Sequence, residues 1–250
     1  PLQSGEGGSR PELSIEKIQL ELLEKVRALG KPVVVVLFNG RPLVLTDVVG
    51  KVDAIVEAWF PGTEGGNAVA DVIFGDVNPS GKLTMSFPRR VGQVPLYYNE
   101  FNTGRPVKTS IHNSRFTSRY IDVENSPLYP FGYGLSYTEF LYDDLKVQLL
   151  EKENALSVIV EASIKNIGNL EGAEVVQLYI VDVEASVERP LHELKAFEKI
   201  NLKPEEVRKI HFILNEEAFS FYSVKDKCFK IEDGAFMIQV GSSSRNIHLE

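Results

Sequence analysis

The stretch from residue 54 to residue 87 constrains the fold of this chain more than any other. Residues 54–60 are mostly apolar and have the length of a buried strand, and a Pro-Gly turn follows them. Two further glycines allow a close backbone approach before a helical pattern that Asn67 can cap and that Gly75 ends. Residues 83–87 then form another apolar run. The stretch therefore predicts a strand, a helix and a second strand.

The preceding residues continue the same alternation of helix and strand. Apolar residues at helical spacing over 15–29 predict a helix with Ser14 as its N-cap and Gly30 beyond its end. The uninterrupted branched run at 33–38 is typical of a parallel strand that is covered on both faces. Residues 44–50 predict a short helix. Together these patterns predict an α/β layer around a mostly parallel sheet.

From residue 140 onward the apolar period changes to about two, which is typical of strands with one buried face. Roughly six or seven short strands at this spacing predict an antiparallel β-sandwich. Before them, residues 89–138 show no lasting period, as in a functional or connecting segment. The sequence thus predicts an α/β domain over 1–105, an irregular connector over 106–139 and a β-sandwich over 140–250.

Charge and composition exclude several classes of function. The chain of 250 residues carries 35 acidic and 27 basic side chains, a net charge of −8, which disfavours nucleic acid and anionic membranes as partners. The apolar run at 32–38 is too short to span a bilayer. Cys228, the one cysteine, cannot form an internal disulfide and is expected to pack in the interior. No signal peptide is visible at Pro1, but because the chain is expected to be part of a longer one, this absence does not decide between the cytoplasm and export.

The glycine turn over 62–67 lies between a predicted strand and a predicted helix, a place where phosphates often bind. It fits neither the dinucleotide pattern nor the P-loop pattern, so a packed turn is the favoured interpretation. The 4 histidines lack the spacing of metal ligands, and neither a metal site nor an organic cofactor is predicted. No G-x-S-x-G nucleophile motif is present.

Several aromatic residues are predicted to lie in or beside loops. They would most often serve the core or an interface. The alternative is stacking against the apolar face of a sugar. These residues are Trp59, Phe60, Tyr97, Tyr98 and Phe101.

A series of motifs is similar, in order and spacing, to those of glycoside hydrolase family 3, with bacterial β-glucosidases as the nearest likeness. In the first part these are NGRPL at 39–43, WFPGTEGGN at 59–67, GDVNPSGKL at 75–83, NTGRP at 102–106 and YPFGYGLSY at 129–137. Further motifs resemble the fibronectin type III-like domain of that family. They are GAEVVQLY at 172–179, RP at 189–190, ELKAF at 193–197 and VGSS at 240–243.

The resemblance implies a retaining exo-acting β-glucosidase whose substrates are β-glucosides or short β-glucans. Family members begin with a (β/α)-barrel that carries the nucleophilic aspartate, and no such segment is present here. The chain is therefore expected to be the C-terminal region, with the barrel of the same protein as its partner. Retaining glycosidases need two carboxyl groups about 5 Å apart. The candidate general acid/base is Glu6, in a loop over 4–10 that resembles the loop carrying this acid in some members. In other members the acid lies several residues earlier, which corresponds to a position before Pro1.

The resemblance also implies that loops at the carboxyl ends of the predicted strands face the barrel and the substrate. The candidate substrate-binding residues are Asn39, Arg41, Trp59 and Glu64. A chain separated from its barrel should expose an apolar patch, which self-association as a homodimer would relieve. The alternative is a non-catalytic carbohydrate-binding or adhesion module, and a barrel encoded upstream would discriminate between the two.

Overall fold

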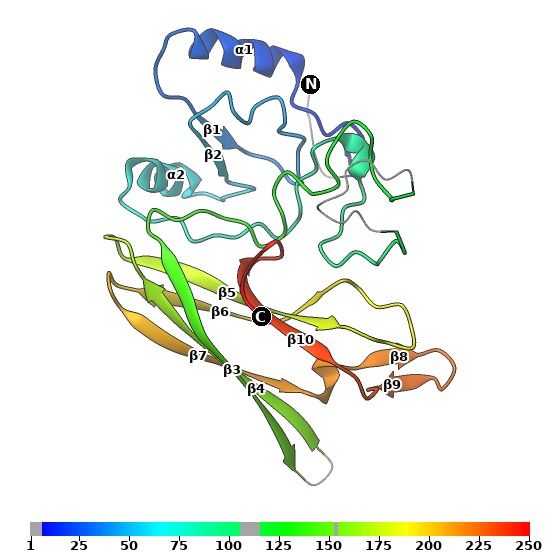
Figure 1. Ribbon diagram of the computed structural model, residues 1–250. Coiled ribbons are helices and arrows are strands. Elements are labelled where there is room, and N and C mark those ends of the chain that lie inside the picture. Colours follow the sequence, from blue (N-terminus) through cyan, green and yellow to red (C-terminus); the bar gives the residue numbers. More distant parts are fainter. Residues whose placement is uncertain (1–6, 106–115, 153–154) are drawn as a thin grey trace. The chain divides into compact units, whose positions relative to one another are not determined.

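The computed structural model describes residues 7–105, 116–152 and 155–250, which form two compact units (Figure 1). Each unit is assembled from separate stretches of the chain. The first unit comprises the described residues up to Asp76, Met85–Tyr97 and Arg119–Pro130. The second comprises Val77–Thr84 and the described residues of Tyr98–Ser118 and Phe131–Glu250. No helix in the described ranges has the length and hydropathy needed to cross a bilayer.

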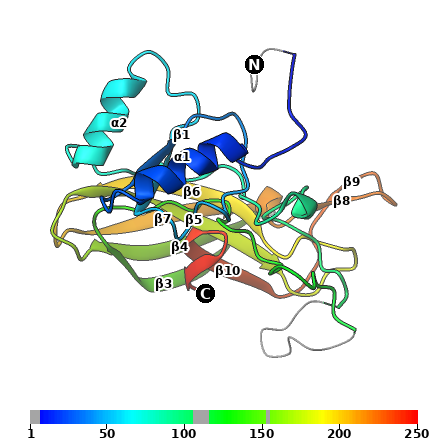
Figure 2. The same ribbon diagram turned by 90° about the horizontal axis from the view of Figure 1, so that it is seen from above.

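The first unit is built on two parallel strands, β1 (Val34–Leu37) and β2 (Ala54–Glu57), as the sequence predicts. Helix α1 (Lys17–Arg27) lies along this pair when viewed from above (Figure 2). Leu23 of α1 is buried together with Val33 and Val48 in a small apolar cluster. The branched residues of β1 thus contribute to a helix-on-sheet core.

Two predictions near α1 were wrong. Ser14 does not cap the helix, because its backbone forms an isolated parallel bridge with Val44 and α1 begins after Glu16. The helix predicted at 44–50 is a series of turns in which the N–H groups of residues 48 and 49 both donate to the Leu45 carbonyl. The bridge keeps Val44 extended, so too few residues remain before Gly50 to form a regular helix.

Helix α2 (Gly65–Phe74) begins earlier than predicted. Asn67 is not its N-cap, because it lies inside the first turn and its Nδ2 donates to Glu64 Oε2 at 2.7 Å. Gly65 and Gly66 are part of the helix, so the helix starts at the residue after Glu64. Gly75 ends the helix as predicted, with φ of 85° in the left-handed region that favours glycine.

The strand predicted at 83–87 does not form, because the segment is divided between the two units. In the first unit, Phe87 makes an isolated antiparallel bridge with Tyr129. In the second unit, the Leu83 N–H donates to the Tyr133 carbonyl at 2.8 Å. The remainder of the first unit includes a single 3-10 turn, η1 (Val91–Gln93), among its described residues.

The second unit is the predicted antiparallel β-sandwich. One sheet has the strand order β3-β4-β7 and the other β11-β10-β5-β6, and a β8–β9 hairpin lies outside both. The bounds are β3 (Phe140–Lys152), β4 (Ala155–Asn166), β5 (Gly172–Asp182), β6 (Glu193–Leu202), β7 (Val207–Asn215), η2 (Glu216–Ala218), β8 (Phe221–Ser223), β9 (Cys228–Lys230), β10 (Phe236–Ser243) and β11 (Asn246–Leu249). Alternate apolar residues of both sheets face inward, and Val160, Leu178 and Val240 are fully buried.

Cys228 is exposed, so the prediction that it packs in the interior was wrong. It lies in β9, opposite Ser223 of β8. This two-stranded hairpin belongs to neither main sheet, and the cysteine therefore has no facing layer of the sandwich to cover it.

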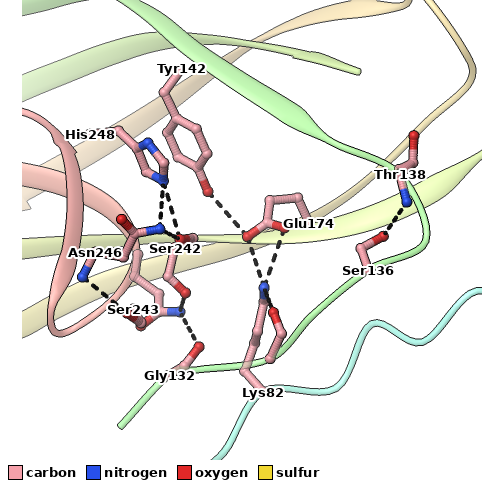
Figure 3. A network of polar contacts seen from close by, with 12 residues as sticks. Lys82, Gly132, Ser136, Thr138, Tyr142, Glu174, Ser242, Ser243, Asn246 and His248 are labelled. Atoms are coloured by element: carbon pink, nitrogen blue, oxygen red, sulfur yellow. Dashed lines mark hydrogen bonds and ion pairs between the residues drawn. The ribbon is translucent and has the colours of Figure 1, made fainter. Parts of the chain in front are cut away.

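A buried ion pair anchors the segment Val77–Thr84 within the β-sandwich unit (Figure 3). Lys82 Nζ lies 3.1 Å from Glu174 Oε1 and donates to the Gly134 carbonyl at 2.9 Å. The side chains of Lys82 and Glu174 are only 11% and 4% exposed. Tyr142 donates its hydroxyl to the same carboxylate at 3.1 Å. Burial raises the pKa of Glu174, while Lys82 and Tyr142 oppose that rise.

A second buried anchor, in the same unit, is the amide of Gln177. Its Nε2 donates to the carbonyls of Gly132 at 3.2 Å and Ser242 at 2.7 Å, and its Oε1 accepts the Tyr179 hydroxyl at 2.6 Å. Gly132 has φ of +81°, and a Cβ there would lie 2.1 Å from Gln177 Oε1. The residue at 132 must therefore be glycine for this contact to form.

We predict that Lys82→Met lowers the free energy of unfolding by about 3 kcal/mol at pH 8, because it leaves Glu174 buried without a cation. Removing Lys82 raises the folded pKa of Glu174 further above its unfolded value. The penalty is thus complete above the folded pKa and shrinks as the pH falls through it toward 5. Urea denaturation at several pH values measures this. The control is Lys146→Met, whose pair with Asp144 is exposed and should contribute under about 1 kcal/mol. A loss independent of pH would contradict the assignment.

We also predict that Gly132→Ala destabilises the protein more than Gly104→Ala. Both glycines have positive φ, at +81° and +73°, but a Cβ at Gly104 would meet no atom of the described residues within 4 Å. The shared cost of left-handed backbone is about 1–2 kcal/mol. The displacement of buried Gln177 should add about 1–3 kcal/mol at Gly132 alone. Equal shifts of the urea midpoint in the two variants would show that the Gln177 contact is unimportant.

Candidate functional site

The candidate site lies at the carboxyl ends of β1 and β2, where the loops after two neighbouring parallel strands meet. The amide of Asn39, just after β1, connects these loops. Its Nδ2 donates to the Arg41 carbonyl at 2.8 Å and to Glu57 Oε2 at 3.3 Å. The loop after β1 is thereby bonded both to itself and to the last residue of β2.

Glu57 bonds in turn to the loop that follows its own strand. Its Oε1 accepts the backbone N–H of Trp59 at 2.9 Å. Trp59 has φ of +48°, in the left-handed region that a bulky residue adopts rarely. Burial raises the pKa of Glu57, and the hydrogen bonds from Trp59 and Asn39 oppose the rise. The carboxylate therefore fixes two loops from one half-buried position.

Packing of the same loops is close. A Cβ at Gly40 would lie 2.9 Å from Cε2 of the Phe60 ring, so a larger residue there would displace this exposed ring. The Trp59 ring packs against Phe87 with centroids 5.9 Å apart and planes tilted by 56°. The two loops are thus held by ring packing as well as by hydrogen bonds.

The structure brings three of the predicted substrate-binding residues together: Asn39, Arg41 and Trp59 connect through Glu57. Glu64 is exposed beside α2, and its carboxylate accepts the Asn67 amide. Glu6, the candidate general acid/base, lies outside the described residues. Sequence reasoning missed Glu57. The available signal was a single carboxylate at the end of an otherwise apolar strand.

The five loop aromatics divide between packing and exposure. Trp59 packs on Phe87, and Tyr98 stacks on Phe131 in the second unit with ring centroids 4.3 Å apart. Phe60, Tyr97 and Phe101 are 72%, 66% and 54% exposed. Trp59 and Tyr98 are half-buried, and their ring contacts are of the kind the core interpretation predicts. The other three rings are accessible to a partner or a ligand.

The cluster formed by Asn39, Arg41, Glu57 and Trp59 offers hydrogen-bonding groups and an aromatic ring, a combination that suits a polyhydroxylated ligand with an apolar face. As the structure describes it, this cluster contains one carboxylate. A retaining glycosidase requires two. The cluster can therefore form part of a sugar site but cannot by itself supply the chemistry.

Comparison with known families gives two matches along the chain. The glycosyl hydrolase family 3 C-terminal domain matches residues 1–137. The fibronectin type III-like domain matches residues 174–244. The order of the two matches is that of the α/β unit and the β-sandwich strands.

Similar proteins cover almost the whole chain. A periplasmic beta-glucosidase of Salmonella typhimurium is 48% identical over 242 residues, which are 97% of this chain and 31% of the relative. A beta-xylosidase of Formosa agariphila is 44% identical over 241 residues, 96% of this chain and 32% of the relative. The solved beta-glucosidase of Listeria innocua in complex with glucose is 46% identical, with a TM-score of 0.89 over 97% of this chain and 34% of that one.

The chain thus spans about a third of the length of the relatives it matches. Its motifs, its parallel strands with their bonded loops, and its β-sandwich all correspond to one region of these glycosidases. The chain belongs to glycoside hydrolase family 3 and matches the C-terminal region of that family's β-glucosidases and β-xylosidases.

Proposed function

We propose that this chain acts within a retaining exo-β-glucosidase that hydrolyses β-glucosides or short β-glucans. In this proposal it supplies one wall of the active site. The observation that carries the proposal is the match of nearly the whole chain to about a third of proteins named as β-glucosidases. The bonded loops after β1 and β2 support it, because carboxyl ends of parallel strands are where α/β sheets bind ligands.

The partner in this proposal is an N-terminal barrel of the same polypeptide. Uncovered apolar side chains of the first unit support such a partner. On α1, Ile18 and Leu22 are 71% and 61% exposed, whereas Leu23 is buried, and Leu29 just after the helix is 71% exposed. Phe74 of α2 is 82% exposed. Apolar surface of this kind marks contact with another protein part. A second copy of the chain would cover it in a homodimer if the barrel did not.

We assign the chemistry to two carboxyl groups from different parts of the protein. An aspartate of the barrel attacks the anomeric carbon and forms a covalent glycosyl-enzyme, while the acid, for which Glu6 is the candidate, protonates the departing oxygen. Water then releases the sugar, with the same residue acting as base. Burial against the barrel and the charge of the nucleophile would raise the pKa of Glu6 enough for it to hold that proton.

We predict that the 250-residue chain hydrolyses no aryl β-glucoside, whereas the full-length protein does. The reason is that the chain lacks the attacking carboxylate of the proposed mechanism. The test measures hydrolysis as release of the aryl alcohol, which is monitored by its absorbance with equal molar amounts of the two proteins. Turnover by the chain alone would contradict the shared active site. If the full-length protein binds cello-oligosaccharides in affinity electrophoresis but hydrolyses no glucoside, a non-catalytic carbohydrate-binding module is the better assignment.

We predict that Glu6→Gln in the full-length enzyme lowers kcat on cellobiose by about 10²–10⁴-fold. On a dinitrophenyl β-glucoside the loss should be under about tenfold, because that leaving group departs without protonation. The matched control is Glu12→Gln, a nearby carboxylate whose hydrogen bonds are local to Leu13 and Ser14. An unchanged kcat on cellobiose would remove Glu6 from the mechanism and favour an acid before Pro1.

A further inference from the structure

We infer that Glu57 is a positioning residue that holds Trp59 and Arg41 in place for sugar binding, directly through the Trp59 backbone and indirectly through Asn39. The inference rests on the proposed function, because it concerns the same wall of the site. Its basis is the set of contacts made by the two oxygens of one carboxylate.

The first contact holds Trp59. Its N–H donates to Glu57 Oε1 at 2.9 Å, and its φ of +48° requires support from the surroundings because it is unfavourable for a bulky residue. Glu57 is the last residue of β2, which is hydrogen-bonded to β1 along its length. The acceptor is therefore attached to a rigid element, while the residue it holds is in a loop.

The second contact holds Arg41. Glu57 Oε2 accepts Asn39 Nδ2 at 3.3 Å, and the same nitrogen donates to the Arg41 carbonyl at 2.8 Å. Asn39 Oδ1 is buried and accepts no hydrogen bond from the part of the chain that the structure describes. An amide that leaves its oxygen unsatisfied keeps this orientation only if the bonds to its nitrogen outweigh that cost. Glu57 thus fixes the amide that fixes the Arg41 backbone.

Fold stability alone does not explain a carboxylate at this position. The preceding residues of β2 are apolar, and burial disfavours the charged form of Glu57. In the described ranges, no Lys or Arg forms an ion pair with Glu57. Its carboxylate accepts hydrogen bonds from the Trp59 N–H and the Asn39 amide. The charge is therefore used to orient these two loops.

The test compares Glu57→Gln, Asn39→Ala and the double variant in the full-length enzyme. The glutamine carbonyl can still accept the Trp59 N–H, but its NH₂ would then oppose the Asn39 NH₂, donor against donor. We expect Glu57→Gln to raise KM for an aryl β-glucoside by roughly tenfold with kcat changed by less than about threefold. In the Asn39→Ala background the same change should raise KM by less than about twofold. Additive losses in the double variant would overturn the inference.

The matched control is Glu21→Gln, an exposed carboxylate of the same unit that pairs with Lys17. It should leave KM and kcat unchanged. Circular dichroism of each variant verifies folding. Glutamine is close in size to glutamate, so Glu57→Gln still tests the inference if a smaller residue at position 57 prevents the protein from folding. A general loss of activity and folding in Glu57→Gln, without the KM-selective effect, would indicate a merely structural residue and overturn the inference.

A second measurement does not depend on hydrolysis. Labelling the full-length protein with 5-fluorotryptophan gives a ¹⁹F resonance for Trp59, assigned by its disappearance in Trp59→Phe. Because the ring packs 5.9 Å from Phe87, a relaxed turn would change its shielding. We expect this resonance to move in Glu57→Ala and to stay in place in Glu21→Gln. An unmoved resonance overturns the inference. If the enzyme hydrolyses no glucoside, the proposed function fails while the resonance still reports whether Glu57 holds Trp59.

Discussion

Parallel hydrogen bonding between β1 and β2 is the constraint on which the candidate site depends. Residues 34–37 pair in register with residues 54–57, so both strands end at the same edge and their following loops emerge side by side. This pairing brings Asn39 within hydrogen-bonding distance of Glu57, which is eighteen positions along the chain. It also lets Gly40 approach Phe60 closely. The loop geometry is therefore a consequence of strand register.

Buried polar contacts have the corresponding role in the β-sandwich unit, where hydrophobic packing alone would not fix the segments that precede the strands. Lys82 joins the segment Val77–Thr84 to Glu174 of β5, and Gln177 of the same strand holds Gly132. Both contacts involve carbonyl groups of irregular backbone, those of Gly134 and Gly132. Their directionality defines one position for each segment, which a purely apolar surface would not do.

The sequence was sufficient to predict the elements that local side-chain periodicity determines. It was insufficient where a contact with a residue distant in the sequence determines the local structure. The branched run at 33–38 and the alternation after Phe140 predicted β1 and the sandwich, because side-chain periodicity follows from burial. The N-cap at Ser14 and the helix at 44–50 failed because these two segments pair with each other through the Ser14–Val44 bridge. The predicted strand at 83–87 failed because its residues are shared between two compact units.

The candidate site shows the same division. The family motifs made Asn39, Arg41, Trp59 and Glu64 candidates, but no local pattern distinguished Glu57 from an ordinary strand-end carboxylate. Its importance depends on two N–H donors that only the fold brings to it. The contrast with Glu174 is informative, since burial raises the pKa of both. Glu174 has the ammonium of Lys82 within its own unit, which accounts for a structural charge. Among the described residues, Glu57 receives hydrogen bonds from neutral donors only, and a half-buried carboxylate held without a cation is more typical of a functional site than of a scaffold.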